Sequence, residues 1–489
     1  MPILETFSAL FVIALTFGLY SMLGQRKAEL VEIVESRVSW QASARAGLGK
    51  WIAISNNVAA ITSLATVYVF FIGSARLFGW WTFACCASIF LGSYITNFFT
   101  ERIRSRQEIA ITLSEAQQKG AVLASFADLF TASHHYSRLV KAVSMLAIAG
   151  VVWMEFAVFG DITGSLLNYS TDGKVVLVWV VCFGVVYFTL RFGLRGMFLT
   201  DILHAPLIVG AGAFLLLGAV IVFTTAGQGS ALNWKALGLP ILDTLTCVLF
   251  LLHVLILNSF LVLVSESHWL RLWMLGDAEV IQQKSAQGVT AVTWAMLIFV
   301  GLLASAISGG KIDIEAIATF LRRIENFTPL FVVAFWVGGM ASLFSTADCQ
   351  IFCFRLVQVF KPGTGISGNR VLVAAPFLTS LAVATAVSFL YYTIRFHGIQ
   401  FDKIVFSVIP FTLSLLPLLF ALAFRKEPSF IALAVSVVGY VAIAAIGLSW
   451  PAENMKATLV AAFWPVAVAC AQVWFGASQP SKASHASGA

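Results

Sequence analysis

Long runs of apolar residues, separated by short polar connections, make up most of this chain. Each run is about as long as a helix that crosses a bilayer, which needs roughly 20 mostly apolar residues. Strands of a membrane barrel would be about 10 residues long and would alternate in polarity. The pattern therefore predicts thirteen membrane-spanning helices, near 4–23, 52–72, 79–98, 142–160, 175–193, 203–224, 241–264, 289–308, 329–352, 371–393, 404–424, 430–449 and 457–476.

Composition strengthens this prediction and sets the domain organisation. Of the 489 residues, 60% are hydrophobic and only 11% are charged, whereas a soluble domain is about 25% charged. The connections between the apolar runs are too short to form soluble domains of about 50 residues or more. We expect an all-α integral membrane protein with one polytopic membrane domain over 1–476 and a short disordered cytoplasmic tail over 477–489.

The distribution of charge predicts the orientation. Thirteen spans put the two termini on opposite sides, and Lys and Arg accumulate in cytoplasmic loops. With the N-terminus outside, the inner segments hold 21 of the 30 basic residues. We predict a cell inner-membrane protein with a cytoplasmic C-terminus, whose net charge of +7 reflects these loops. The sequence has no nucleic-acid-binding motif, and it points to the lipid bilayer and a small solute as partners, without naming a protein partner.

Two polar interruptions of the apolar pattern lie five spans apart. The second span opens with "ISNNVAAITSLAT", and the seventh contains "ILNSFLVLVSES". Inverted repeats of membrane helices place interrupted helices at corresponding positions, with a binding site near mid-membrane. The spacing predicts inverted five-helix repeats over about 45–226 and 238–425, with extra helices at both ends.

The ninth span contains the polar stretch "SLFSTADCQ" at 342–350. Ser342, Ser345 and Thr346 have the i, i+3, i+4 spacing of residues on one helix face. Hydroxyl and carbonyl oxygens can replace the hydration shell of a cation such as sodium. Alternatively, these hydroxyls bond to carbonyls one turn earlier in their own helix. Asp201 lies at the inner end of the sixth span, where an acidic group needs a partner, water or an ion.

Four motifs in the chain resemble those of the sodium:solute symporter family, and the last of the four is the most specific. The likeness covers about 45–425 and implies a leucine-transporter-type fold that couples sodium influx to solute uptake by alternating access. The motifs are "FADLFTASHHYSRLVKAVS" before the fourth span, "GLRGMFLTD" before the sixth, "SESHWLRLWMLGDAEVIQQKS" after the seventh and "GGMASLFSTADCQ" in the ninth.

The resemblance also implies roles for individual residues. Asp201 would support a sodium site by tuning its charge. The implied sodium ligands are the side-chain oxygens of Ser345 and Thr346 and the backbone carbonyls of Ser342, Ala59 and Thr62. The substrate-binding residues implied in the second and seventh spans are Ser63, Thr66, Asn258, Ser259 and Leu263.

The identity of the solute is where the sequence departs from well-known members of that family. Proline carriers have an acidic residue at the position of Ile61, and sugar carriers have acidic and amide side chains at Ala65 and Thr66. We therefore expect neither proline nor a sugar. A small amino acid or a carboxylate is preferred, because free amides at a broken helix suit an anionic group.

Other interpretations remain open at this stage. A proton could replace sodium as the coupling ion, carried by Asp201, Glu155 or His253. The chain could instead be the solute-sensing membrane domain of a signalling system. An enzyme is not predicted, since no nucleophile–base pair, phosphate loop or metal-ligand spacing is present. Beyond sodium, we expect no metal and no cofactor.

Overall fold

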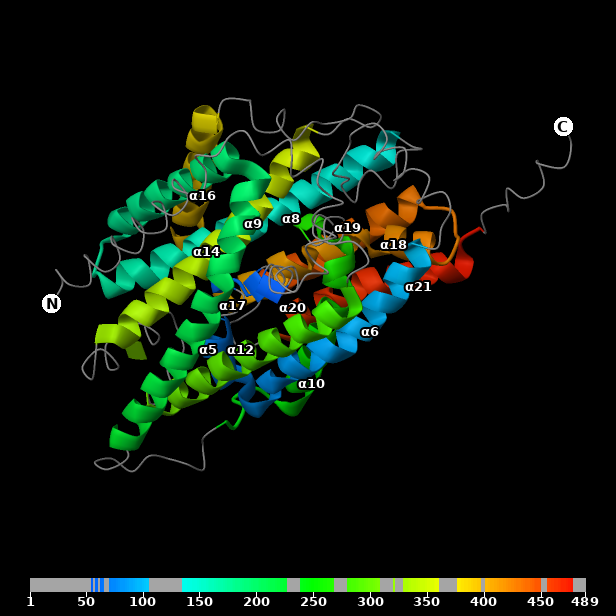
Figure 1. The fold of residues 1–489 in the computed structure, drawn as a ribbon. Helices are drawn as coiled ribbons and strands as arrows, with labels where there is room; N and C mark the ends of the chain where they lie inside the picture. The colour runs from blue at the N-terminus through cyan, green and yellow to red at the C-terminus, as the bar shows by residue number, and fades with distance from the viewer. Residues whose placement is uncertain are drawn as a thin grey trace, which may run out of the picture.

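The structure, a computed structural model, describes residues 54–55, 58–59, 62–65, 70–104, 134–226, 238–267, 279–307, 320–321, 329–359, 376–396, 401–449 and 455–477. All regular elements in these ranges are helices (Figure 1). They are α5 (Phe70–Phe78), η3 (Gly79–Phe83), α6 (Ala84–Arg104), α8 (His134–Leu166), α9 (Thr171–Ala226), α10 (Thr244–Val264), α12 (Glu279–Ile307), α14 (Pro329–Val359), α16 (Pro376–Phe396), α17 (Phe401–Val408), η6 (Ile409–Leu415), α18 (Leu416–Ala423), α19 (Phe430–Ser449), α20 (Lys456–Ala461) and α21 (Phe463–Phe475).

Eleven segments of the described chain are long and apolar enough to cross a membrane. Each overlaps one of the spans predicted from 79–98 onward, so the all-α, multi-pass architecture is confirmed. The predicted span 4–23 lies outside the described residues, as does the tail beyond residue 477. The predicted span 52–72 is described only in part, and it is interrupted rather than continuous.

The fifth and sixth predicted spans form one helix. Two separate helices were predicted, but α9 runs without a break for 56 residues and contains Pro206. Its two apolar halves, Thr171–Arg191 and Thr200–Thr225, are separate membrane spans, and Figure 1 shows the helix changing direction between them. Asp201 therefore lies at the start of the second half.

The second span is broken next to Thr62. The Thr62 N–H donates to the Val58 carbonyl at 3.0 Å, after which Thr62 and Ser63 have no regular secondary structure. Leu64 and Ala65 then form a π-helical turn, and α5 begins at Phe70. The predicted interruption of this span is therefore present.

The interruption of the seventh span lies at the end of the stretch predicted for it. The helix α10 continues through Asn258 and Ser259 and ends at Val264, where Ser265 is extended with φ −83° and ψ 125°. The Ser259 hydroxyl bonds to the Leu255 carbonyl of the same helix at 2.7 Å. Such a back-bond satisfies a polar side chain in a membrane helix without releasing backbone groups, which is why Asn258 and Ser259 do not break α10.

The eleventh span changes its helical type in its middle. Between α17 and α18 lies η6, a 3₁₀ segment of seven residues with Pro410 near its start. A second proline, Pro417, opens α18. Proline lacks the N–H of a helical hydrogen bond and favours the first turn of a helix, so each proline coincides with the start of a new segment.

A seam of small residues brings α6 and α10 together. Ser88, Gly92 and Thr96 are spaced by four residues on α6 and face the α10 backbone at Asn258 and Ser259. The Thr96 hydroxyl donates to the Ser259 carbonyl at 2.9 Å, and the Asn258 amide donates to the Ser88 hydroxyl at 2.6 Å. Small residues at such spacing let membrane helices approach closely, and here they fix the position of Asn258.

Adding a methyl group at Gly92 is expected to destabilise the protein. A Cβ atom there would lie 2.6 Å from both the carbonyl carbon and the oxygen of Asn258, which are backbone atoms that cannot turn aside. Gly92→Ala should therefore lower the melting temperature of the detergent-solubilised protein. Gly210→Ala is the matched control, because a Cβ at this glycine of α9 meets no atom within 4 Å. Equal melting temperatures for the two variants would contradict the close approach.

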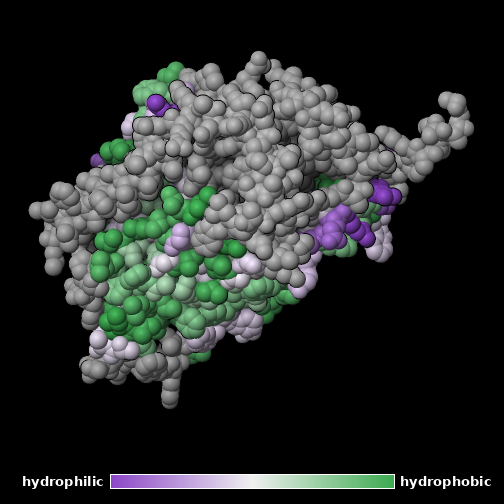
Figure 2. All heavy atoms as spheres, in the orientation of Figure 1, coloured by the Kyte–Doolittle hydropathy of each residue, from purple (hydrophilic) through white to green (hydrophobic). Residues whose placement is uncertain are grey.

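The described outer surface is apolar where it faces lipid. Figure 2 shows hydrophobic side chains gathered over α9 and α12 on the visible face. On α9 the exposed residues repeat at helical spacing along one side, as a lipid-facing stripe does. They are Leu203, Leu207, Phe214, Leu217 and Val220.

The start of α10 carries a polar cap at the edge of its span. The Asp243 carboxylate accepts hydrogen bonds from the Thr246 hydroxyl at 2.8 Å and the Thr246 N–H at 3.1 Å. Lys456, at the start of α20, lies 3.2 Å away. These bonds, with that of Thr246 the strongest, lower the pKa of Asp243 to about 2. Asp243 is therefore a structural cap joining two spans.

Candidate functional site

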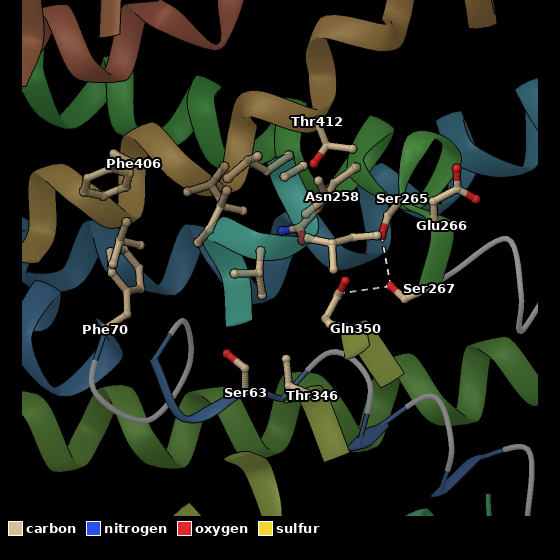
Figure 3. Close-up of a pocket in the computed structure, with 18 of the residues that line it drawn as sticks. Ser63, Phe70, Asn258, Ser265, Glu266, Ser267, Thr346, Gln350, Phe406 and Thr412 are labelled. Carbon is tan, nitrogen blue, oxygen red and sulfur yellow. Dashed lines mark hydrogen bonds between the residues drawn. The ribbon is translucent and has the colours of Figure 1, made fainter. Parts of the chain in front are cut away.

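A cavity of about 190 Å³ lies at the centre of the helical bundle, next to the break in the second span. Its walls come from α5, α6, α8, α10, α12, α14, α17 and η6, so segments far apart in the sequence meet there (Figure 3). The aromatic, hydroxyl, amide and carboxyl side chains that line it are those of Ser63, Phe70, Phe71, Ser144, Asn258, Ser265, Glu266, Ser267, Trp294, Thr346, Gln350, Phe406 and Thr412.

One end of the cavity is aromatic. Phe71 and Trp294 have ring centroids 5.0 Å apart, and Phe70 meets Phe406 edge to face at 5.2 Å. Figure 3 shows Phe70 and Phe406 on the same side of the cavity, away from the labelled polar groups. Edge-to-face and tilted pairs of this kind are favourable and leave flat ring faces for a further apolar group. We call Phe70, Phe71, Trp294 and Phe406 the aromatic end.

The opposite end is lined by amides, hydroxyls and one carboxylate. The Gln350 amide donates to the Ser267 hydroxyl at 3.3 Å, and the hydroxyls of Ser265 and Ser267 are 2.9 Å apart. The Ser144 hydroxyl donates to Glu266 at 3.2 Å. Because the seventh span is interrupted at Ser265, its chain can present three successive polar side chains here. This is the polar end of the cavity.

Below the cavity, the broken second span meets the hydroxyl face of α14. Figure 3 shows Ser63 and Thr346 side by side at this position, and both line the cavity. Ser342 and Ser345 are fully buried in the same helix, as are Ala59 and Thr62 in the second span. The side chain of Leu64 lies 3.2 Å from where a Cβ of Gly339 would be. The break therefore packs directly on α14.

Three hydroxyls in this region lack a hydrogen-bond partner within the described part of the chain. They belong to Thr62, Ser342 and Thr346, although buried polar atoms are nearly always bonded. Isolated hydroxyls without a partner also occur elsewhere, as at Thr290 and Ser436. Here Ser342 and Thr346 share one face of α14, and Thr62 belongs to the broken second span that packs on this helix. Neutral oxygens of this kind fit a sodium ion, which replaces its hydration shell with carbonyls and hydroxyls.

An acidic side chain adjoins this group of hydroxyls. The Ser345 hydroxyl donates to the Asp201 carboxylate at 2.5 Å, and Asp201 is fully buried. The Nδ1 atom of His204, one turn further along α9, is 3.9 Å from the same carboxylate oxygen. On the neighbouring face of α14, Asp348 accepts a 3.5 Å bond from the Thr200 hydroxyl. Two polar pairs therefore join α9 to α14 beside the candidate ion position.

Glu155 of α8 holds the break from the other side. Its carboxylate accepts the Leu64 N–H at 3.0 Å and the Ala65 N–H at 3.2 Å, and it also bonds the Ser63 side chain. The side chain is 0% exposed. An interrupted helix leaves backbone N–H groups without carbonyl partners, and here one carboxylate satisfies two of them. From the sequence, Glu155 was a candidate proton carrier or substrate group.

The structure places some of the predicted substrate residues at the cavity. Ser63 and Asn258 line it. Ser259 and Leu263 are not among its lining residues: the Ser259 hydroxyl bonds to the Leu255 carbonyl of its own helix, and Leu263 is buried in a cluster with Phe99. Thr66 lies outside the described residues.

Several cavity residues were not predicted. Gln350 follows Thr346 by four positions, so its place on the same face of α14 could have been read from the motif. The aromatic end gave no such signal, because phenylalanine and tryptophan inside apolar runs are also ordinary core and lipid-facing residues. Ser144 and Thr412 are likewise single hydroxyls in apolar surroundings.

The arrangement of the helices corresponds to a known membrane-protein fold. The chain has the leucine-transporter-type fold, as predicted. It is similar over 97% of its length, and over 98% of the other chain, to a Na⁺-coupled sialic acid symporter in a substrate-bound, outward-open state, with a TM-score of 0.61 and 13% sequence identity. The resemblance of its motifs to the sodium:solute symporter family is consistent with this fold.

Two other solved structures match most of this chain with lower TM-scores. The inward-facing conformation of Mhp1 matches 87% of this chain and 91% of its own, with a TM-score of 0.46 and 14% identity. A manganese transporter from Eremococcus coleocola matches 87% of this chain and 86% of its own, with a TM-score of 0.43 and 12% identity. No family model matches the sequence, and the comparison with curated proteins finds no match.

Proposed function

We propose that this protein is a secondary active transporter of the sodium:solute symporter family that couples sodium influx to the uptake of a small organic solute by alternating access. The observation that carries the proposal is the meeting of the broken second span with the hydroxyl face of α14 beside the cavity, where backbone carbonyls of the break and the partnerless Thr346 hydroxyl can supply oxygens. An ion at these oxygens would share a wall with the solute, since Thr346 borders both. That shared wall gives the two ligands a route to favour each other's binding.

Each proposed ion ligand has a role in this scheme. Ser345 and Thr346 would supply side-chain oxygens, and Ser342, Ala59 and Thr62 would supply carbonyls. Asp201 carries the negative charge that offsets the ion, through its bond to Ser345. The ion is transported cargo rather than a resident cofactor, and we propose no other metal and no catalytic activity.

Proton coupling is a second candidate, and one specific contact favours it. Asp201 lies 3.9 Å from the imidazole of His204, so two titratable side chains lie close together beside the ion position. His253, which the sequence also offered as a proton carrier, instead makes structural contacts. Its Nδ1 lies 2.9 Å from the Leu459 carbonyl, and its ring meets Phe406 edge to face, so it joins α10 to α20 in the core.

The proposal includes the membrane and the orientation. We place the protein in the cell inner membrane with its N-terminus outside and its C-terminus in the cytoplasm, on the distribution of Lys and Arg. A solute-sensing role in a signalling system is the remaining alternative. Accumulation of solute inside vesicles separates the two, because a sensor binds without accumulating.

Sodium alone should stabilise the purified protein. A ligand that binds only the folded state raises stability by RT ln(1 + [L]/Kd), about 2.7 kcal/mol at a concentration 100 times Kd. We expect the melting temperature in detergent to rise with NaCl but not with KCl or choline chloride at equal ionic strength. If the three salts give the same curve at neutral pH, and a lower pH raises the melting temperature instead, sodium coupling is wrong and the proton candidate takes its place.

A further inference from the structure

The break in the second span already has an anion bound to its backbone. In transporters built from broken helices, the N-terminus of a half-helix points at anionic groups of the substrate. Here the N–H groups of Leu64 and Ala65 point at the carboxylate of Glu155, at 3.0 and 3.2 Å. We call the place of this carboxylate the anion position.

The anion position adjoins the cavity but is closed to it. Ser63 lines the cavity and bonds to Glu155, while Glu155 itself is not among the lining residues and is 0% exposed. A solute carboxylate in the cavity would therefore find the amides of Leu64 and Ala65 in use. This removes the reason for which the sequence favoured an amino acid or a carboxylate.

The charges around the cavity also argue against a solute with a carboxylate. Among the described residues that line it there is no Lys, Arg or His, and the ionisable carboxyl group is that of Glu266. Burying an ionised group without a counter-charge is costly. The proposed sodium ion has its negative partner in Asp201, so it does not call for a second carboxylate from the solute.

The remaining groups fit a neutral ring compound. The aromatic end offers flat apolar faces, and the polar end offers the amides of Asn258 and Gln350, which can donate and accept at once. We propose that Glu155 permanently fills the anion position at the broken helix, and that the transported solute is therefore a small uncharged molecule with a flat ring and an amide-like polar edge. The part about the solute rests on the proposed transport function.

The anion position can be tested by chemical rescue. Glu155→Ala leaves two buried N–H groups without an acceptor, so its melting temperature should fall. Potassium acetate, which can place a carboxylate in the vacated space, should raise it again in a concentration-dependent way relative to potassium chloride. Wild-type protein should not respond to acetate, because its anion position is filled.

Asp161→Ala is the control for this rescue. Asp161 is a buried carboxylate on the same helix that accepts a 2.5 Å bond from the Tyr391 hydroxyl, and it binds no backbone N–H at the break. Equal rescue of both alanine variants, or no rescue of Glu155→Ala, would overturn the anion position. Should Glu155→Ala fail to fold, Glu155→Gln takes its place. Its neutral amide is a weaker acceptor, so its stability should fall below that of Asp161→Asn, and an unchanged melting temperature would overturn the assignment.

The solute class is tested with matched pairs of compounds. Benzamide, nicotinamide and uracil are the neutral probes, and benzoate, nicotinate and phenylalanine are the charged ones. In sodium chloride, the neutral probes should raise the melting temperature of wild-type protein and the charged ones should not. A larger shift with the charged probes, or no shift with any neutral probe, would overturn the proposed class.

The outcomes also separate this inference from the proposed function. Acetate rescue is measured in potassium salts, so it does not depend on sodium binding or transport. Sodium stabilisation is measured without any solute. A protein that shows rescue but no sodium response keeps the anion position and loses sodium coupling, whereas the reverse result keeps sodium coupling and loses the anion position.

Discussion

Replacing Ser345 and Thr346 together by alanine is expected to abolish both the stabilisation by sodium and sodium-stimulated uptake into vesicles. The double variant removes two of the proposed oxygen ligands, and it removes the hydroxyl that holds Asp201 at 2.5 Å. Thr346 has no hydrogen-bond partner in the described chain, so its loss breaks no bond in the protein itself. The melting temperature in potassium chloride should fall, because the buried Asp201 carboxylate loses the Ser345 donor, but it should no longer rise when sodium replaces potassium.

A matched pair of serines provides the control for this double variant. Ser380 and Ser388 are buried in α16; Ser380 bonds to the Pro376 carbonyl at 2.6 Å and the Ser388 hydroxyl has no partner. Ser380→Ala with Ser388→Ala thus removes one bonded and one partnerless hydroxyl away from the cavity. Uptake by this variant should keep its sodium dependence. If Ser345→Ala with Thr346→Ala keeps it as well, the ion position is wrong.

Neutralising Asp201 is expected to weaken sodium binding by about 10- to 100-fold, since hydrogen bonds to charged groups contribute about 1.5–3 kcal/mol and each 1.4 kcal/mol is a factor of ten. Asp201→Asn keeps the shape of the side chain and an oxygen that can accept from Ser345. What it removes is the negative charge next to the proposed ion. The sodium concentration that gives half of the maximal shift in melting temperature measures the effect.

Asp161→Asn is the control for Asp201→Asn. Its carboxylate is also buried and also accepts a hydroxyl at 2.5 Å, from Tyr391, so both variants neutralise the same kind of bond. Only Asp201→Asn should shift the sodium titration. If Asp201→Asn leaves sodium binding intact but abolishes uptake driven by a pH gradient, Asp201 carries a proton and the second candidate is favoured.

The arrangement of spans was predictable because the bilayer imposes a length on every crossing helix. The position of a break was not predictable from polarity alone. Asn258 and Ser259 looked like an interruption, but their side chains bond to Ser88 and to the Leu255 carbonyl, so the backbone of α10 remains helical. Among the predicted polar positions, it is Ser265 at which the helix ends. A break requires backbone groups to find other partners, and only tertiary contacts supply these.

The candidate site was predictable where it depends on helical spacing. Ser342, Ser345 and Thr346 share one face of α14 because their spacing fixes it. The role of Glu155 at Leu64 and Ala65 was not predictable, because it depends on two segments about 90 residues apart in sequence meeting in space. The aromatic end also forms only when residues from distant segments meet in space. Nothing in the local sequence of Trp294 or Phe406 distinguishes them from other buried rings.

The 3₁₀ segment η6 lengthens one wall of the cavity. A 3₁₀ helix rises by about 2.0 Å per residue and an α-helix by about 1.5 Å. The seven residues of η6 are therefore about 3.5 Å longer than they would be as α-helix. Ile409 and Thr412 border the cavity from this segment. The extra rise places α17 and Phe406 farther from α18 along the span axis than a continuous α-helix would.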